Sequence, residues 1–369
     1  MWKHSTGKGI TIALIDTGVR KTASLKGRVL RGKDWTRKQG NEFKDTDGHG
    51  TSMAELIAGK ANGVKGLAPA SKIIPHKISL KSSKKELGKG SEADRAIRAA
   101  ANSPAKIINI SLGGYHTPQL AESVKYARSK GKLLFAATGN DGAGKNSYEF
   151  PAGYPEVVGV ASTDANGKRS KTSSYGDSVD LGAPGKDAPY WCDETFTRYC
   201  NGDGGTSAAT ALASASAALL WSKHPNWTAN QVLRVLINTA GKPKWGKVPS
   251  IYGGYGVVRP RMNLLDNEGD PGPADTSPWP GKAKARGKYG TPELANPNPD
   301  DSKATDNKDN NHPDDKGTDT DPHDQNQATH PDNSHKSSDN ALYLTLGATV
   351  AVVLGGAGVY ALLRRRRNP

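Results

Sequence analysis

The chain has 369 residues, a formal net charge of +15 and only two cysteines. Its length would allow two domains, but the composition changes sharply near residue 265, from alternating apolar patterns to polar sequence without periodicity. No nucleic-acid-binding motif is present, so we expect no nucleic-acid partner. Scattered lysines are typical of a solubilising surface, although a basic outer surface could meet anionic cell-wall polymers or lipid head groups.

The first predicted element is a short buried strand at residues 10–15, which leads into Asp16-Thr17-Gly18. In open parallel sheets, sites form at the carboxyl ends of strands, so Asp16 is a candidate site carboxylate. Asp-Thr-Gly could instead be an aspartic-protease loop, but that enzyme shares one proton between two carboxylates. The required second loop is absent from the sequence.

A second motif, Gly48-His49-Gly50-Thr51, precedes a helical pattern over residues 51–58. A lone histidine in a glycine-rich turn is more often structural than catalytic. Strand and helix patterns then alternate at residues 72–78, 92–101, 107–111, 119–130, 133–137 and 157–161. This alternation predicts an α/β fold, a mostly parallel sheet flanked by helices on both faces, in one domain over residues 1–265.

A third motif, Gly205-Thr206-Ser207-Ala208-Ala209, opens an Ala-rich helical pattern that reaches about residue 222 with almost no polar face. A helix that is apolar all round is a buried one. The Gly-Thr-Ser stretch could instead serve only as the N-cap of this helix, with no catalytic role. The nucleophile elbow of an α/β-hydrolase is disfavoured, because Ala209 stands where Gly-x-Ser-x-Gly requires its second glycine.

The three motifs together supply a carboxylate, an imidazole and a hydroxyl. A serine hydroxyl becomes nucleophilic only beside a base, and the base needs a buried carboxylate to fix its tautomer. The order Asp16, His49, Ser207 is the chain order of subtilisin-type proteases. We therefore predict that Ser207 is a nucleophile, His49 its general base and Asp16 the orienting carboxylate.

With these motifs the chain resembles the subtilisin-like serine peptidases, or subtilases, over residues 7–262. The segments 66–70, 107–114 and 135–140 are similar to further stretches of that family. The resemblance implies that the Asn140 side-chain amide stabilises the oxyanion together with the Ser207 N–H. Without that resemblance, Asn140 would be a turn residue in Gly-Asn-Asp-Gly.

The resemblance also implies the substrate-binding residues nearest the scissile bond: Ser111, Leu112, Gly113, Ala137, Thr138 and Gly139. Two departures from the family pattern leave the pocket shape open. Ala211 replaces the usual proline four residues after the serine, and Thr138 replaces an alanine in Ala-Ala-Gly-Asn. No metal and no cofactor is expected.

Residues 266–340 form a predicted linker, acidic and rich in Pro, Asp and Asn. Such a stretch cannot bury enough apolar area to offset its ordering entropy, so we expect it to be disordered. Its carboxylates could suggest a calcium-binding array. The irregular spacing and the lack of an Asp-x-Asp-x-Asp-Gly loop disfavour that reading.

Residues 341–363 carry no charge and are followed by four arginines within the tail 364–369. At about 1.5 Å per residue, this segment is long enough for a transmembrane helix. The positive-inside tendency places the tail in the cytoplasm. We therefore expect a single-pass protein of the cell membrane, with an extracellular catalytic domain and a cytoplasmic C-terminus.

Cys192 and Cys200 lie close together in a predicted loop before the third motif. For a domain outside the membrane, a disulfide between them is expected. Two unlinked thiols are the alternative. Such a short bridge would rigidify the segment that leads to Ser207 more than it would stabilise the fold.

The order of peptidase domain, acidic linker, membrane helix and basic tail resembles the mycosins, subtilases associated with type VII secretion. The paired cysteines and residues 254–260 are also similar to that subgroup. An exported domain needs a signal peptide, whereas Met1 leads almost directly into the first strand. We therefore expect a basic, apolar leader to be encoded upstream, in preference to a tail-anchored cytosolic protease.

The sequence thus predicts a membrane-anchored serine endopeptidase that acts on protein or peptide substrates, with a type VII secretion membrane complex as a possible partner. Two alternatives remain at this point. One is a structural member of a secretion complex with incidental proteolysis, and the other is a general cell-surface degradative protease.

Overall fold

The structure is a computed structural model that describes residues 1–36, 38–60, 63–80, 91–242 and 248–279. All of these residues belong to one unit of the chain, Met1–Ala304. Most of the predicted linker, the predicted membrane helix at 341–363 and the tail at 364–369 lie outside the described residues. In the part that is described, no helix is long and apolar enough to cross a membrane.

A seven-stranded, wholly parallel sheet organises the described residues, in the order β2-β3-β1-β4-β5-β6-β7. Because β3 and β4 pair on opposite sides of β1, the direction of strand addition reverses at β1. The carboxyl edge at such a reversal is where open α/β sheets form their sites. The strands are β1 (Thr11–Asp16), β2 (Lys33–Asp34), β3 (Lys72–Lys77), β4 (Ile107–Ile110), β5 (Leu133–Ala137), β6 (Val157–Thr163) and β7 (Leu181–Pro184).

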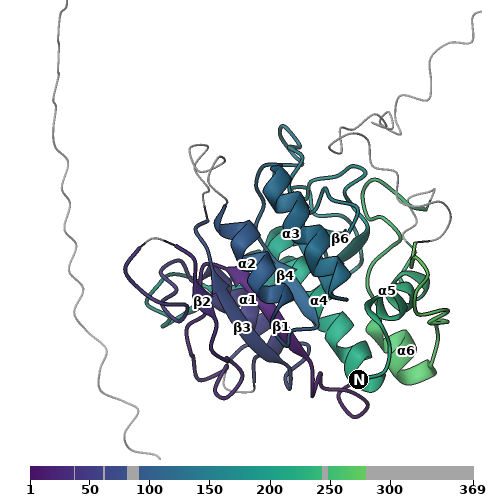
Figure 1. The fold of residues 1–369 in the computed structure, drawn as a ribbon, viewed down its shortest axis with the longest axis horizontal. Coiled ribbons are helices and arrows are strands. Elements are labelled where there is room, and N and C mark those ends of the chain that lie inside the picture. The colour runs from purple at the N-terminus through teal and green to yellow at the C-terminus, as the bar shows by residue number, and fades with distance from the viewer. Residues whose placement is uncertain (37, 61–62, 81–90, 243–247, 280–369) are drawn as a thin grey trace, which may run out of the picture. The chain divides into compact units, whose positions relative to one another are not determined.

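In the part of the chain that the structure describes, six helices cover both faces of the sheet (Figure 1). Successive strand side chains point to opposite faces, and β1 divides accordingly. Ile12 and Leu14 pack in one core cluster with α1, α4 and α5, whereas Ala13 and Ile15 pack in the other with α2 and α3. The helices are α1 (His49–Ala58), α2 (Glu92–Ala101), α3 (Pro118–Ser129), α4 (Gly205–Lys223), α5 (Ala229–Asn238) and α6 (Pro260–Asp266). The predicted α/β fold is confirmed.

The Ala-rich helix α4 is buried, as its pattern predicts. Its polar residues find partners inside the core. Ser214 Oγ donates to Asn109 Oδ1 of β4 at 2.9 Å, and Thr210 Oγ1 donates to the Thr206 carbonyl one turn earlier at 2.7 Å. The small side chains allow α4 to pack closely on the sheet, which brings its first turn to the carboxyl edge.

A second, two-stranded antiparallel sheet pairs β8 (Lys186–Trp191) with β9 (Tyr199–Asp203). This hairpin occupies the stretch that the sequence pattern indicated only as a loop, and it contacts α1.

The packed chain extends past the domain boundary predicted at residue 265. Arg234 of α5 donates to the carbonyl of Thr276 at 3.0 Å, and Gln231 donates to that of Gly272 at 2.9 Å. The ring of Trp279 stacks against Tyr255. Side chains of α5 therefore hold the start of the predicted linker, which composition alone did not indicate.

Candidate active site

Asp16 and His49 form the centre of the site. Asp16 ends β1 and is completely buried, and His49 begins α1. Asp16 Oδ1 contacts His49 Nδ1 at 2.7 Å and accepts the backbone N–H of Thr17 at 2.8 Å. Burial alone would lower the pKa of His49, but the charge and hydrogen bond of Asp16 outweigh it, with help from Asp47 and Asp45, so that pKa is raised.

A further carboxylate, Asp45, fixes the start of α1. It is 5% exposed, and its oxygens accept the backbone N–H groups of Asp47, Gly48 and Thr51 and the hydroxyls of Thr17 and Thr51. These bonds satisfy N–H groups at the helix start that have no partner within the helix. Asp45 was not among the predicted site residues. It lies three residues before Gly48, the N-cap residue of α1, and no motif of fixed spacing marks it.

Ser207 lies in the first turn of α4 and is 8% exposed. Its Oγ donates to the backbone oxygen of Ser111 at 2.9 Å, and the Ser111 hydroxyl donates back to the Ser207 carbonyl at 3.1 Å. The hydroxyl of Ser207 therefore donates to the backbone just after β4. Ser207 and His49 line one cavity of about 290 Å³, and catalytic hydrogen bonds commonly shorten only when substrate is bound.

Asn140 follows β5 and faces the same cavity. Its Oδ1 accepts the Thr206 backbone N–H at 2.9 Å and the Thr206 hydroxyl at 3.0 Å. These two bonds orient the amide, which leaves Nδ2 as a donor. Gly205 permits this approach: it has a positive φ of 58°, and a Cβ there would lie 2.5 Å from Asn140 Oδ1.

The structure brings most of the predicted substrate-binding residues into this cavity. Ser111, Leu112, Gly113, Ala137 and Gly139 line it. Thr138 does not, because alternate positions at the end of β5 face opposite sides. It is 1% exposed, and its hydroxyl donates to the Val160 carbonyl of β6 at 3.1 Å.

Two further residues line the cavity that the sequence did not single out, Leu80 and Glu149. Leu80 follows β3, and Glu149 lies in the irregular segment between Asn140 and β6. Neither belongs to a motif with a fixed spacing. Only the packing of loops from separate parts of the chain places them beside Ser207.

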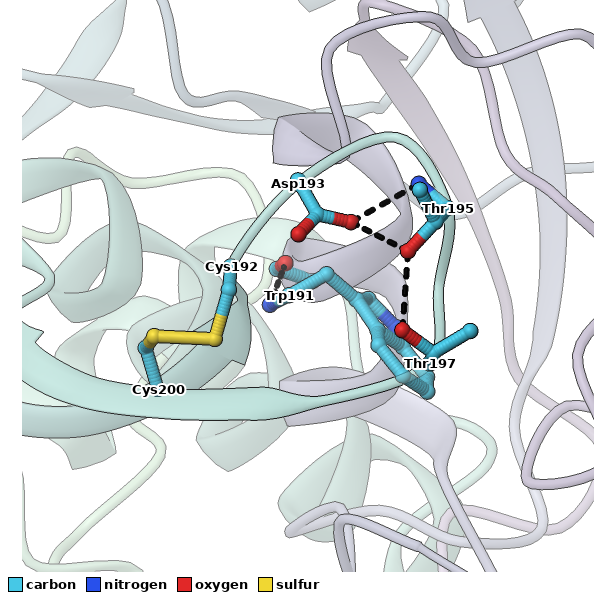
Figure 2. The surroundings of a disulfide bond; sticks show 7 residues. Trp191, Cys192, Asp193, Thr195, Thr197 and Cys200 are labelled. Carbon is cyan, nitrogen blue, oxygen red and sulfur yellow. Dashed lines mark hydrogen bonds between the residues drawn. A yellow bond between two sulfur atoms is a disulfide. The ribbon is translucent and has the colours of Figure 1, made fainter. Parts of the chain in front are cut away.

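A disulfide joins Cys192 to Cys200 across the β8–β9 hairpin, with the two Cα atoms 5.1 Å apart. Figure 2 shows the loop that it closes, in which Asp193 accepts the backbone N–H and the hydroxyl of Thr195. The hairpin is bonded to α1, because the Trp191 backbone N–H donates to Ser52 Oγ at 2.9 Å. The disulfide-closed hairpin thus contacts the helix that carries His49.

The fold and these residues agree with the comparisons with known proteins. The profile of the Subtilase family, Peptidase S8, matches residues 7–276. The chain belongs to this family and is a subtilisin-like serine peptidase. Thermitase of Thermoactinomyces vulgaris is 34% identical over 247 residues, a match that covers 65% of this chain and 84% of thermitase.

Among solved structures, this chain is similar to two mycosins. MycP1 with its N-terminal propeptide removed has a TM-score of 0.60 and 28% identity, over 72% of this chain and 94% of that one. The MycP3 protease from the type VII (ESX-3) secretion system has a TM-score of 0.60 and 29% identity, over 72% and 85%. The resemblance to mycosins noted from the sequence is confirmed.

Proposed function

We propose that this chain is a membrane-anchored serine endopeptidase that hydrolyses peptide bonds through an acyl-enzyme and acts in type VII secretion. The observation that carries the catalytic part is the convergence of four groups. His49, Ser207 and Asn140 line one cavity at the carboxyl edge of the sheet, and the buried Asp16 contacts His49 at 2.7 Å.

In the proposed reaction, Ser207 Oγ turns from Ser111 to the substrate carbonyl carbon, and its proton passes to His49 Nε2. Asp16 stabilises the imidazolium that forms. The tetrahedral oxyanion accepts hydrogen bonds from Asn140 Nδ2 and the Ser207 N–H. His49 then protonates the leaving amine, and a water molecule activated by His49 hydrolyses the acyl-enzyme.

The oxyanion interactions supply a large share of the expected rate. In subtilisin, a member of the same family, loss of one side-chain donor of this kind lowers kcat about 10²–10³-fold. The position of Asn140 suits this role because the first turn of α4 holds Oδ1, so the amide needs little reorganisation when charge develops.

The secretion context rests on the structural likeness to MycP1 and MycP3. Membrane anchoring rests on the uncharged stretch at 341–363 and the arginines that follow it. In this proposal the peptidase lies outside the cell membrane, where an intact Cys192–Cys200 disulfide is expected.

The direct test is labelling of the full-length chain with a serine-reactive fluorophosphonate. We expect wild type to be labelled and Ser207→Ala to be unlabelled. Ser222→Ala, which changes a serine at the other end of α4, is the matched control and should label like wild type. Absence of labelling in folded wild-type protein would refute an assembled nucleophile and favour a structural role in a secretion complex.

A further inference from the structure

The active-site cavity contains a carboxylate that the proposed reaction does not use. Glu149 lines the cavity beside His49, Asn140 and Ser207. A Cβ built on Gly113 would lie 2.5 Å from Glu149 Oε2, and one on Gly139 would lie 3.0 Å from its Cγ. The Glu149 side chain therefore lies against the two glycine backbones that follow β4 and β5.

These two glycines belong to the segments expected to flank the substrate residue next to the scissile bond. Neither carries a side chain, so a substrate side chain that enters beside their backbones would reach the Glu149 side chain that lies against them. The substrate residue that supplies the attacked carbonyl must lie beside Ser207, and its side chain is then the one that enters this part of the cavity.

The Glu149 carboxylate has no hydrogen bond or ion pair with any residue that the structure describes, although it is only partly exposed. Burial raises its pKa, and the negative charge of Asp141 raises it further. A partly buried carboxylate without a partner is unfavourable, and a cation that arrives with a ligand relieves that cost.

The neighbouring Asp141 differs in having its own partners. It accepts the Ser147 backbone N–H at 3.0 Å, the Ser147 hydroxyl at 2.6 Å and the Ser174 hydroxyl at 2.9 Å. Burial would raise the pKa of Asp141, but these hydrogen bonds outweigh it and lower the pKa. Asp141 thus adds negative potential near Glu149 while its own oxygens are occupied.

The remaining lining of the cavity favours a long side chain with a cationic end. Leu80, Leu112 and Ala137 offer apolar contacts for methylene groups. Of the lining residues that the structure describes, His49 is the only other ionisable one, and it is engaged with Asp16. No described lining residue would compete with a substrate cation for Glu149.

We propose that Glu149 determines specificity by binding a lysine or arginine side chain of the substrate, so that the peptidase cleaves after basic residues. This inference rests on the proposed function of the Asp16, His49 and Ser207 site. It assigns to Glu149 the role of a substrate-binding residue and not of a catalytic one.

The test uses the full-length enzyme and peptides that differ only at the residue before the cleaved bond: lysine, arginine, norleucine or glutamate. Norleucine retains most of the lysine stem without its charge. We expect wild type to show kcat/KM about 10- to 100-fold higher for lysine than for norleucine, the range that a hydrogen bond to a charged group supports. In Glu149→Gln this ratio should fall to near one, and in Glu149→Lys glutamate should become preferred over lysine.

The matched control is Glu122→Gln, which removes an exposed carboxylate of α3 and should keep the wild-type ratio. Equal cleavage after lysine and norleucine by wild type, or an unchanged ratio in Glu149→Gln, would overturn the assignment. Fluorophosphonate labelling distinguishes failure of the role of Glu149 from failure of the proposed function. An enzyme that is labelled and cleaves without basic preference refutes only the role of Glu149, whereas an unlabelled folded enzyme refutes the proposed function and this inference with it.

Discussion

At the scale of single residues, three carboxylates surround His49 and act on it by different means. Asp16 is buried and hydrogen-bonded to the ring. Asp45 is occupied by the start of α1 and so fixes the position of His49. Asp47 is exposed and acts on the ring through its charge. The two buried groups thereby orient the ring. All three charges raise the pKa of His49, Asp16 most, and only that of Asp47 is exposed to screening by solvent.

The first prediction concerns the pH dependence of activity. His49 must be neutral to accept a proton, and its pKa lies above the ordinary value of 6.5. The acidic limb of the kcat/KM profile should therefore have its midpoint above pH 6.5, with activity rising as pH rises through it. Asp47→Asn removes a negative charge that favours the imidazolium, so it should shift this limb to lower pH.

The measurement is kcat/KM against pH at low and at high salt. Because Asp47 is exposed, we expect the shift caused by Asp47→Asn to shrink at high salt. Asp164→Asn, at a turn after β6, is the control and should leave the limb in place. An acidic limb that Asp47→Asn does not move at low salt would contradict the proposed influence of this charge on His49.

Residue identities were predictable from sequence where chemistry requires a fixed residue in a fixed local setting. The structure brings His49, Asn140 and Ser207 to one cavity and places the buried Asp16 in contact with His49, from four separate segments. Thr138 stays a prediction from the family resemblance: it does not line the cavity, and its hydroxyl donates to the Val160 carbonyl. Glu149 was missed because its position depends on how a long irregular segment folds back over β4 and β5.

At the scale of elements, the β8–β9 hairpin and α1 stabilise each other. Tyr199 OH donates to Glu55 Oε2 at 2.8 Å, and Thr22 Oγ1 donates to Glu55 Oε1 at 2.6 Å. Glu55 is fully buried in α1. Burial raises the pKa of its carboxyl, and the hydrogen bonds from Thr22 and Tyr199 oppose that rise. The carboxylate therefore depends on a donor from the hairpin.

The second prediction follows from that bond. Tyr199→Phe removes a donor to a buried carboxylate, so it should lower the free energy of unfolding by about 1–3 kcal/mol at neutral pH. The effect should diminish as pH falls through the raised pKa of Glu55, because the lost bond stabilises only the ionised carboxylate. Urea unfolding at several pH values would measure both.

The matched control is Tyr190→Phe, which removes a tyrosine hydroxyl from the opposite strand of the same hairpin. It should change the unfolding free energy by less than about 0.5 kcal/mol. A loss of stability of equal size in the two variants would show that the Tyr199–Glu55 bond is not specific in its effect.

Helices and strands were predicted correctly where the apolar periodicity of the sequence is strong. The prediction failed where a disulfide and aromatic contacts, instead of a periodic apolar face, hold an element together. The helix predicted at 92–101 has those bounds, and the strand predicted at 10–15 is displaced by one residue. The hairpin was not predicted, since β8 and β9 are mostly half-exposed. Stacking of Trp191 on Tyr199 and the Cys192–Cys200 disulfide hold it together.

At the scale of the whole molecule, the sequence divides into parts with different physical tasks. The apolar, periodic part gives the subtilase fold over residues 7–276. Composition changes character near residue 265, where the domain boundary was predicted. It could not anticipate that Arg234 and Gln231 would bind the backbone at 272–276, because such contacts leave no periodic pattern.

The last prediction concerns the proposed membrane topology. Four arginines after the uncharged stretch favour a cytoplasmic C-terminus, so a cysteine at Ser337 and one at Asn368 should lie on opposite sides of the membrane. The two native cysteines, Cys192 and Cys200, are joined in a disulfide. The introduced cysteine would therefore supply the reactive thiol of each variant. In intact cells, a membrane-impermeant maleimide should label Ser337→Cys and should label Asn368→Cys only after permeabilisation.

Removal of residues 341–369 provides the complementary measurement. If this stretch is the anchor, the shortened chain should leave the membrane fraction. Fluorophosphonate labelling of Ser207 should persist, because the deletion leaves the family match at residues 7–276 intact. The reverse labelling pattern would place the peptidase in the cytoplasm and require the arginines to cross the membrane. That result would refute both the proposed extracellular location and a role that depends on exported substrates.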